Sequence, residues 1–109
     1  MNIEELRGLN WKEKRALAQE TCDEQILIVL AEDKSARVRK AIMQRADLPI
    51  EVIEKSYQHT RSLYEKLLIF KSIRNLKTKE DLLRILNQLS NDSEELVRYH
   101  AKDYLDKIS

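Results

Sequence analysis

The chain has 109 residues, of which 20 are lysine or arginine and 19 are aspartate or glutamate, so its formal net charge is +1. This balance argues against a dedicated nucleic-acid or membrane module, and any electrostatic preference must come from local segregation of charge. A chain of this length fits one small domain, which buries about two thirds of its unfolded surface. With one glycine and one proline, the composition favours an all-α fold.

Residue pairs that cap helix N-termini mark the starts of five predicted helices, because an acceptor followed three residues later by a carboxylate satisfies free backbone amides. The pairs are Asn10 with Glu13, Thr21 with Glu24, Ser62 with Glu65, Thr78 with Asp81, and Asp92 with Glu95. Pro49 marks a sixth start, since its fixed φ suits the first helical position. The predicted helices cover residues 3–7, 11–20, 23–32, 36–46, 49–57, 63–75, 79–90 and 94–107. Large rings such as Trp11 and Phe70 are expected in the core or the N-terminal cap.

Two segments carry the same residue pattern at a constant offset. The first has Leu30, Asp33, Val38 and Arg39 and the second has Leu89, Asp92, Val97 and Arg98, so 89 minus 30 and 98 minus 39 both give 59. Such a repeat indicates one supersecondary unit used more than once. We expect a single domain over residues 1–109, with a cap at residues 1–20 and helical hairpins at residues 21–46, 47–75 and 76–109. The middle hairpin is the degenerate one, with His59 and Thr60 near the position of the Asp.

The pattern Leu-x-x-Asp-x-x-x-x-Val-Arg, within residues 11–107, resembles HEAT-like repeats, and residues 30–51 are similar to their variant leucine-rich relatives. The resemblance implies a short right-handed α-solenoid of about three hairpins, an armadillo-type fold. It also implies a structural ladder between repeats, formed by Asp33 with Arg39 and by Asp92 with Arg98. The spacing has a physical reason as well, because an Asp at the turn caps the second helix while the Arg, one turn inside this helix, faces the same carboxylate.

Few patterns in the sequence indicate catalysis or a bound cofactor. The only histidines are His59 and His100, and neither stands at a metal-ligand spacing from the other or from Cys22. Some variant leucine-rich relatives hold iron and sulfur with several cysteines, whereas Cys22 is alone here and is expected to be a partly buried small side chain. Gly8 is the only glycine, which excludes a glycine-rich phosphate loop. We therefore expect no enzyme activity, no metal and no cofactor.

Basic residues are concentrated in two segments that contain no acidic residue, residues 34–46 and residues 66–79, with five lysines or arginines each. Both cover second helices of adjacent hairpins, which by the resemblance line the concave face of a HEAT-like stack. The candidate partner-binding residues, called the basic strip below, are Arg37, Lys40, Gln44, Tyr64, Lys71, Arg74 and Tyr99. The alternative interpretation is that these charges only solubilise exposed faces and suit helix C-termini.

The favoured function is a non-catalytic protein-interaction module, a scaffold that presents a concave helical surface to an acidic or helical partner protein. The alternative is nucleic-acid binding through the basic strip, as in HEAT-like DNA-repair glycosylases. No apolar run approaches the roughly 18 residues of a spanning helix, and Met1 leads into a charged amphipathic stretch, so we expect no membrane partner and a cytoplasmic protein. Because Tyr99, Tyr104, Leu105 and Ile108 have no repeat after them, a monomer or a weak homodimer is expected.

Overall fold

Helices account for all the regular structure in the computed structural model, which describes residues 2–60 and 62–108. In this part of the chain they are α1 (Ile3–Arg7), α2 (Trp11–Glu20), α3 (Glu24–Ala31), α4 (Ala36–Met43), α5 (Ile50–Gln58), α6 (Leu63–Ser72), the 3₁₀-helix η1 (Ile73–Asn75), α7 (Lys79–Leu89) and α8 (Glu95–Ile108). Each α-helix lies within a few residues of a predicted one, because caps and turns are local signals. The predicted all-α class is confirmed.

Three of the predicted caps form as expected. Asn10 and Glu13 make a complete capping box, in which each side chain accepts a hydrogen bond from the other residue's amide. The hydroxyl oxygens of Ser62 and Thr78 each accept a hydrogen bond from the amide three residues later. These caps begin α2, α6 and α7, the first of which opens directly on Trp11.

The other predicted starts differ in detail. The carboxylate of Asp23, rather than the hydroxyl of Thr21, accepts hydrogen bonds from the first amides of α3, because Thr21 ends α2 and binds the amide of Asp23 instead. Pro49 precedes α5 with an extended ψ of 155° and is therefore its cap residue rather than its first helical residue. Asp92 binds the amide of Glu94, one residue earlier than predicted.

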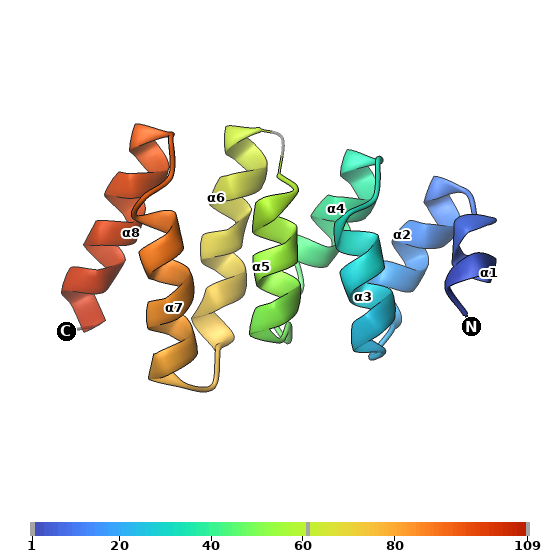
Figure 1. Ribbon diagram of the computed structural model, residues 1–109, viewed down its shortest axis with the longest axis horizontal. Helices are drawn as coiled ribbons and strands as arrows, with labels where there is room; N and C mark the ends of the chain where they lie inside the picture. Colours follow the sequence, from blue (N-terminus) through green and yellow to red (C-terminus); the bar gives the residue numbers. More distant parts are fainter. Residues whose placement is uncertain (1, 61, 109) are drawn as a thin grey trace.

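The helices stand side by side along the longest dimension of the molecule, with the two termini at opposite ends (Figure 1). Helices α2, α4, α6 and α8 contact one another in chain order and are called the even row, and α3, α5 and α7 form an odd row in the same way. The Cα atoms extend over 44 × 26 × 16 Å. The smallest extent fits two layers of helices about 10 Å apart. The even row therefore supplies one broad face of the molecule.

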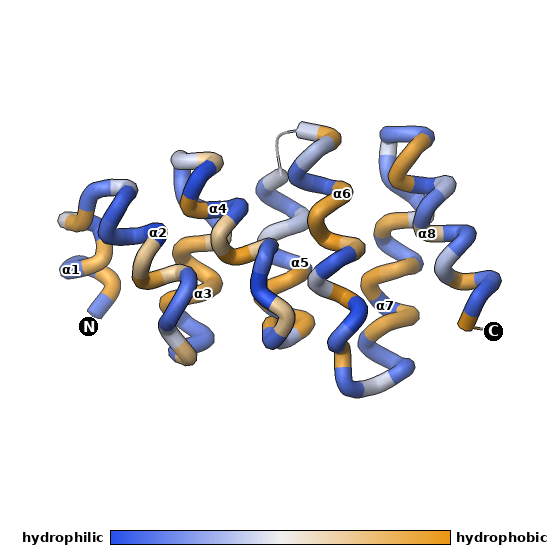
Figure 2. The backbone as a smooth tube through the Cα atoms, turned by 180° about the vertical axis from the view of Figure 1, so that it is seen from behind, coloured by the Kyte–Doolittle hydropathy of each residue, from blue (hydrophilic) through white to orange (hydrophobic). Residues whose placement is uncertain are grey.

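One continuous hydrophobic core fills the space between the rows. Every α-helix contributes fully buried side chains, which include Leu6, Ala18, Leu30, Ile42, Ile53, Ile69, Leu86 and Val97. Hydrophobic stretches accordingly recur on all helices from α2 to α8 (Figure 2). Trp11 and Phe70 are half-buried and pack against this core, as predicted. Over residues 2–60 and 62–108, no helix combines the length and the apolar character that crossing a membrane requires.

Candidate binding surface

Ion pairs join consecutive helices of the even row. The basic partner is the fourth residue of its helix in each case, and the acidic partner lies near the start of the next even-row helix. The pairs, called the polar ladder below, are Lys14 with Asp33 (Nζ to Oδ1, 2.9 Å), Arg39 with Glu65 (Nη2 to Oε1, 2.9 Å) and Lys66 with Asp92 (Nζ to Oδ1, 3.0 Å). The polar ladder thus sets the register between neighbouring hairpins.

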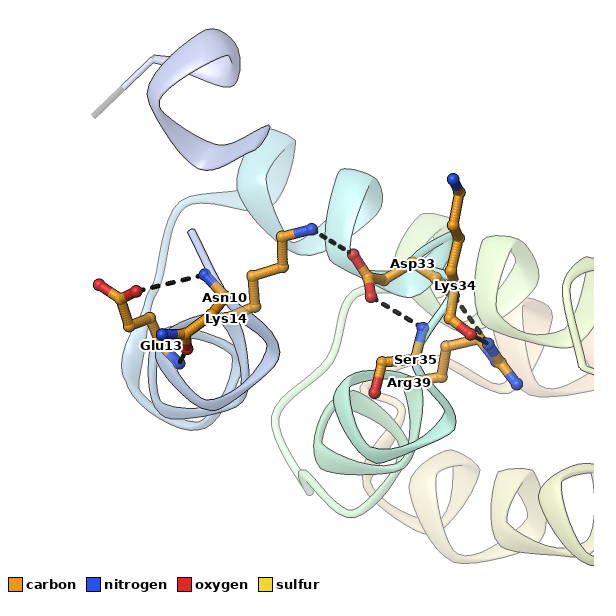
Figure 3. A network of polar contacts seen from close by, with 7 residues as sticks. All are labelled: Asn10, Glu13, Lys14, Asp33, Lys34, Ser35 and Arg39. Atoms are coloured by element: carbon orange, nitrogen blue, oxygen red, sulfur yellow. Dashed lines mark hydrogen bonds and ion pairs between the residues drawn. The ribbon is translucent and has the colours of Figure 1, made fainter. Parts of the chain in front are cut away.

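The arginines of the repeated motif bind main-chain carbonyl oxygens. Arg39 Nη1 donates to the carbonyl oxygens of Asp33 at 2.7 Å and Lys34 at 2.9 Å (Figure 3), and Arg98 Nη1 donates to that of Asp92 at 2.8 Å. The prediction that each Arg binds the Asp carboxylate is therefore wrong. Carbonyl groups after a helix C-terminus lack intrahelical partners and carry partial negative charge, which attracts the guanidinium.

The carboxylates of the motif have other partners. Asp33 accepts a hydrogen bond from the Ser35 amide at 2.9 Å and binds Lys14 with its other oxygen (Figure 3). Asp92 likewise accepts the Glu94 amide at 2.8 Å. The prediction that each Asp caps the free amides of the second helix is wrong in detail, because each carboxylate accepts the amide of the residue immediately before that helix. The link to the preceding hairpin, through a lysine of the previous even-row helix, was missed.

The degenerate middle hairpin takes part in the polar ladder through a different acidic residue. Its turn has no Asp, and Glu65 in the first turn of α6 takes that place as the partner of Arg39. Their side chains are only 3% and 4% exposed, respectively. From the sequence, Glu65 was interpreted only as the capping partner of Ser62. A basic residue at the fourth position of each second helix is the signal that would have found it.

The carboxylate of Asp92 joins three segments of the chain. It accepts hydrogen bonds from the Tyr57 hydroxyl, the Glu94 amide and the Lys66 ammonium. Burial raises the pKa of Asp92, but these three hydrogen bonds lower it by a larger amount. The net pKa therefore lies below its ordinary value. Burial, followed by the hydrogen bond to Asp92, raises the pKa of Tyr57 above its ordinary value.

Cations of the basic strip lie over aromatic rings of neighbouring even-row helices. The Arg37 guanidinium of α4 lies 4.4 Å from the centre of the Trp11 ring at the start of α2. The Lys40 ammonium, one turn later in α4, lies 5.2 Å from the centre of the Tyr64 ring of α6. Tyr64 nevertheless remains 56% exposed. These contacts hold the cations in place while keeping them at the surface.

The remaining residues of the basic strip are spread along the same row. Gln44, Lys71 and Arg74 are exposed at or just after the C-terminal ends of α4 and α6. Tyr99 of α8 is 63% exposed and packs edge-on against His100, with ring centres 5.6 Å apart. The structure therefore brings Lys40 and Tyr64 together, whereas the other members are spread along the same row and its extension.

Sequence reasoning missed three members of this surface. Besides Arg37, the Trp11 ring is approached by Lys12 and Arg15, with the ammonium 5.7 Å and the guanidinium carbon 5.4 Å from its centre. Trp11 was assigned to packing alone, yet Arg15 stands four residues later in the same helix, a spacing that places its side chain beside the ring. The basic surface therefore begins at α2.

Charge differs between the two rows. Helices α2, α4, α6 and α8 carry eleven basic and six acidic residues, whereas α3, α5 and α7 carry three basic and five acidic ones. In the odd row, the guanidinium of Arg84 binds the carboxylate of Glu54 through two hydrogen bonds. The odd row is thus acidic overall, and part of its negative charge is neutralised by basic residues of the same row. The even row is the cationic face.

An open groove of about 680 Å³ lies between α6, η1 and α8. It is lined by Leu67, Phe70, Arg74, His100, Asp103, Tyr104, Lys107 and Ile108. The Phe70 and His100 rings approach each other across it, with their centres 5.8 Å apart. Arg74 belongs to both the groove and the basic strip. The even row therefore offers an apolar depression beside its cations.

Among the described residues, no group of three or more His, Cys, Asp or Glu side chains is placed to hold a metal ion. Cys22 is exposed, contrary to the expectation of partial burial, because it lies in the turn between α2 and α3. Comparison of the chain with protein-family models, curated proteins and solved structures found no match. Function must therefore be inferred from the even-row surface itself.

Proposed function

We propose that the chain is a short right-handed α-solenoid of HEAT-like hairpins, comprising residues 21–46, 47–75 and 76–109 behind a cap at residues 1–20. Two features support this proposal. The helices of each row contact one another in chain order, and the polar ladder recurs between successive even-row helices. In such a stack each hairpin buries the open face of its neighbour, so the repeats are stable together rather than alone.

We propose further that the chain is a non-catalytic protein-interaction module that binds an acidic segment of a partner protein on its even row. The observation that carries this proposal is the separation of charge between the rows, with cations of the even row fixed over Trp11 and Tyr64. Cations held over rings lose less freedom on binding than free lysine or arginine side chains do. Electrostatic complementarity then supplies association rate and specificity.

The groove beside Arg74 adds an apolar component to this surface. Leu67 and Phe70 line it from α6 and Tyr104 from α8, so one hydrophobic side chain of the partner has a place to insert. Burial of such an anchor provides affinity that exposed ion pairs do not, since exposed pairs contribute little. A segment that combines acidic residues with a bulky apolar residue is the ligand we propose.

Fluorescence anisotropy tests this proposal with two labelled probes, a 12-residue peptide of glutamate with a central phenylalanine and a 12-nucleotide single-stranded RNA. We expect saturable binding of the peptide by the full chain. Reversing the charge of a strip residue, as in Arg37→Glu or Lys40→Glu, is expected to weaken binding at least tenfold. Lys77→Glu makes the same charge change in the exposed turn before α7 and is expected to have little effect. Circular dichroism checks that each variant folds.

Nucleic-acid binding is the competing outcome of this experiment. Neutralising several phosphates would make the affinity for RNA fall steeply as salt is raised. Tighter binding of the RNA than of the peptide, lost with Arg37→Glu and with increasing salt, would overturn the protein-interaction proposal in favour of the nucleic-acid alternative. Peptide binding that is unchanged by Arg37→Glu and by Lys40→Glu would overturn the assignment of the surface.

A further inference from the structure

A fourth basic residue stands at the ladder position of its helix but has no acidic partner among the described residues. Arg98 is the fourth residue of α8, the position that Lys14, Arg39 and Lys66 occupy in α2, α4 and α6. Each of those three binds a carboxylate near the start of the next even-row helix. Within residues 2–60 and 62–108, no helix follows α8 and no carboxylate forms an ion pair with Arg98.

Arg98 is held in the same way as its counterpart in α4. Its Nη1 donates to the carbonyl oxygen of Asp92 at 2.8 Å, as Nη1 of Arg39 donates to that of Asp33 at 2.7 Å. In Arg39 this anchor leaves Nη2 directed at Glu65 on the next helix. The guanidinium of Arg98 is therefore positioned for a carboxylate at the corresponding place beyond α8.

The side chains beside Arg98 are exposed to solvent. Leu96 and Tyr99 are 42% and 63% exposed, and with Glu94 and Glu95 they line a shallow hollow of about 490 Å³. Tyr99 is the fifth residue of α8, and in α4 the fifth residue, Lys40, contacts the second residue of the next even-row helix, Tyr64. The end of the even row thus offers both the ionic and the side-chain contacts that join helices inside it.

We propose that this end of α8 is a second docking surface, for a helix of a partner protein that carries Asp or Glu at its N-terminal end. The carboxylate would pair with Arg98 as Glu65 pairs with Arg39, and the side chain beside it would pack on Tyr99. An acidic residue is also favoured at this end of the partner helix by the helix dipole. The proposal does not depend on the function proposed above, because its ionic contact is made by Arg98, which lies outside the basic strip, and the two surfaces share Tyr99 alone.

Nuclear magnetic resonance of the full chain tests the proposal with a capped synthetic peptide of residues 59–75. This peptide carries Tyr64 and Glu65, the pair that α6 presents to α4. We expect saturable shifts of the Leu96, Arg98 and Tyr99 amide signals. The same peptide with Glu65→Gln is expected to bind at least tenfold more weakly, and so is the original peptide to the Arg98→Gln chain. The Glu65→Gln peptide and the Arg98→Gln chain in combination are expected to weaken binding no more than either change does alone.

Two further variants separate recognition from folding. Arg98→Lys gives up the carbonyl anchor but keeps the charge, and it is expected to retain binding because Lys14 and Lys66 serve the same position. Lys102→Gln removes a charge from an exposed position of the same helix and is expected to change nothing. Equal binding of the two peptides, shifts confined to the basic-strip residues of α4 and α6, or no shifts at millimolar peptide would each overturn the proposal.

Discussion

At the scale of single residues, the ion pair of Arg39 and Glu65 is set apart by its burial. Both side chains are almost fully buried, and Arg39 Nε is buried without a hydrogen-bond partner among the described residues. A buried ion pair gains little over a hydrophobic pair, but losing one partner leaves a charge without compensation. We therefore interpret this pair as fixing the register of α4 against α6 more than as a source of net stability.

The buried pair leads to a first prediction for stability. Glu65→Ala removes the carboxylate that compensates the Arg39 charge, and it is expected to lower the free energy of unfolding by about 3 kcal/mol. Urea denaturation measures this change. Lys107→Ala, which breaks the exposed pair with Asp103, is the control and is expected to cost about 0.3–0.5 kcal/mol. Equal effects of the two substitutions would contradict the role assigned to burial.

Asp92 leads to a prediction for the pH dependence of stability. Its pKa is lower in the folded chain than in the unfolded chain, so the charged carboxylate stabilises the fold fully above an ordinary Asp pKa of about 3.9. This contribution is lost as the pH falls through the lowered pKa. The free energy of unfolding of the wild type is therefore expected to exceed that of Asp92→Asn at pH 7, with the difference shrinking below about pH 4.

Urea denaturation from pH 7 to pH 2 measures this difference. Asp103→Asn is the matched control, because its carboxylate pairs with Lys107 at an exposed site where the pair contributes little at any pH. A difference between wild type and Asp92→Asn that stays constant across the whole range would show that the charge of Asp92 is not what stabilises the turn.

At the scale of helices, starts were predictable wherever the cap is local. Thr78 caps α7 through a hydrogen bond from the Asp81 amide to its hydroxyl oxygen, and both residues are visible in the sequence. The start of α3 was misplaced because Thr21 and Asp23 are both good caps, and only the path of the chain decides between them. Elements were thus better predicted than their exact first residues.

Two caps give a prediction at this scale. Thr78→Ala removes a cap hydrogen bond and is expected to lower the free energy of unfolding by about 1 kcal/mol. Ser35→Ala is the control, because Ser35 precedes α4 without a side-chain cap hydrogen bond, and the turn there is closed by Asp33 binding its amide. Thermal denaturation of both variants measures the effects, and a larger loss for Ser35→Ala would refute this assignment of the caps.

At the scale of the whole molecule, the separation of charge between rows follows from the order of the helices. The basic segments at residues 34–46 and 66–79 fall on α4 and on α6 with its extension, which contact each other in the even row. The assignment of both segments to second helices of adjacent hairpins predicted that they occupy equivalent positions. Which side chains of the two segments meet depends on helix rotation, and only the structure placed Lys40 over Tyr64.

The sequence by itself determined the all-α class, the helices and the caps of three of them, because hydrophobic periodicity and capping act within a few residues. It also marked the basic strip, whose residues all lie on the even row or its extension. Only the tertiary structure decided the partners of Arg39, Lys14 and Lys66, since these contacts join segments 19 to 26 residues apart. Long-range pairing depends on how helices pack and rotate against one another, which local residue patterns do not record.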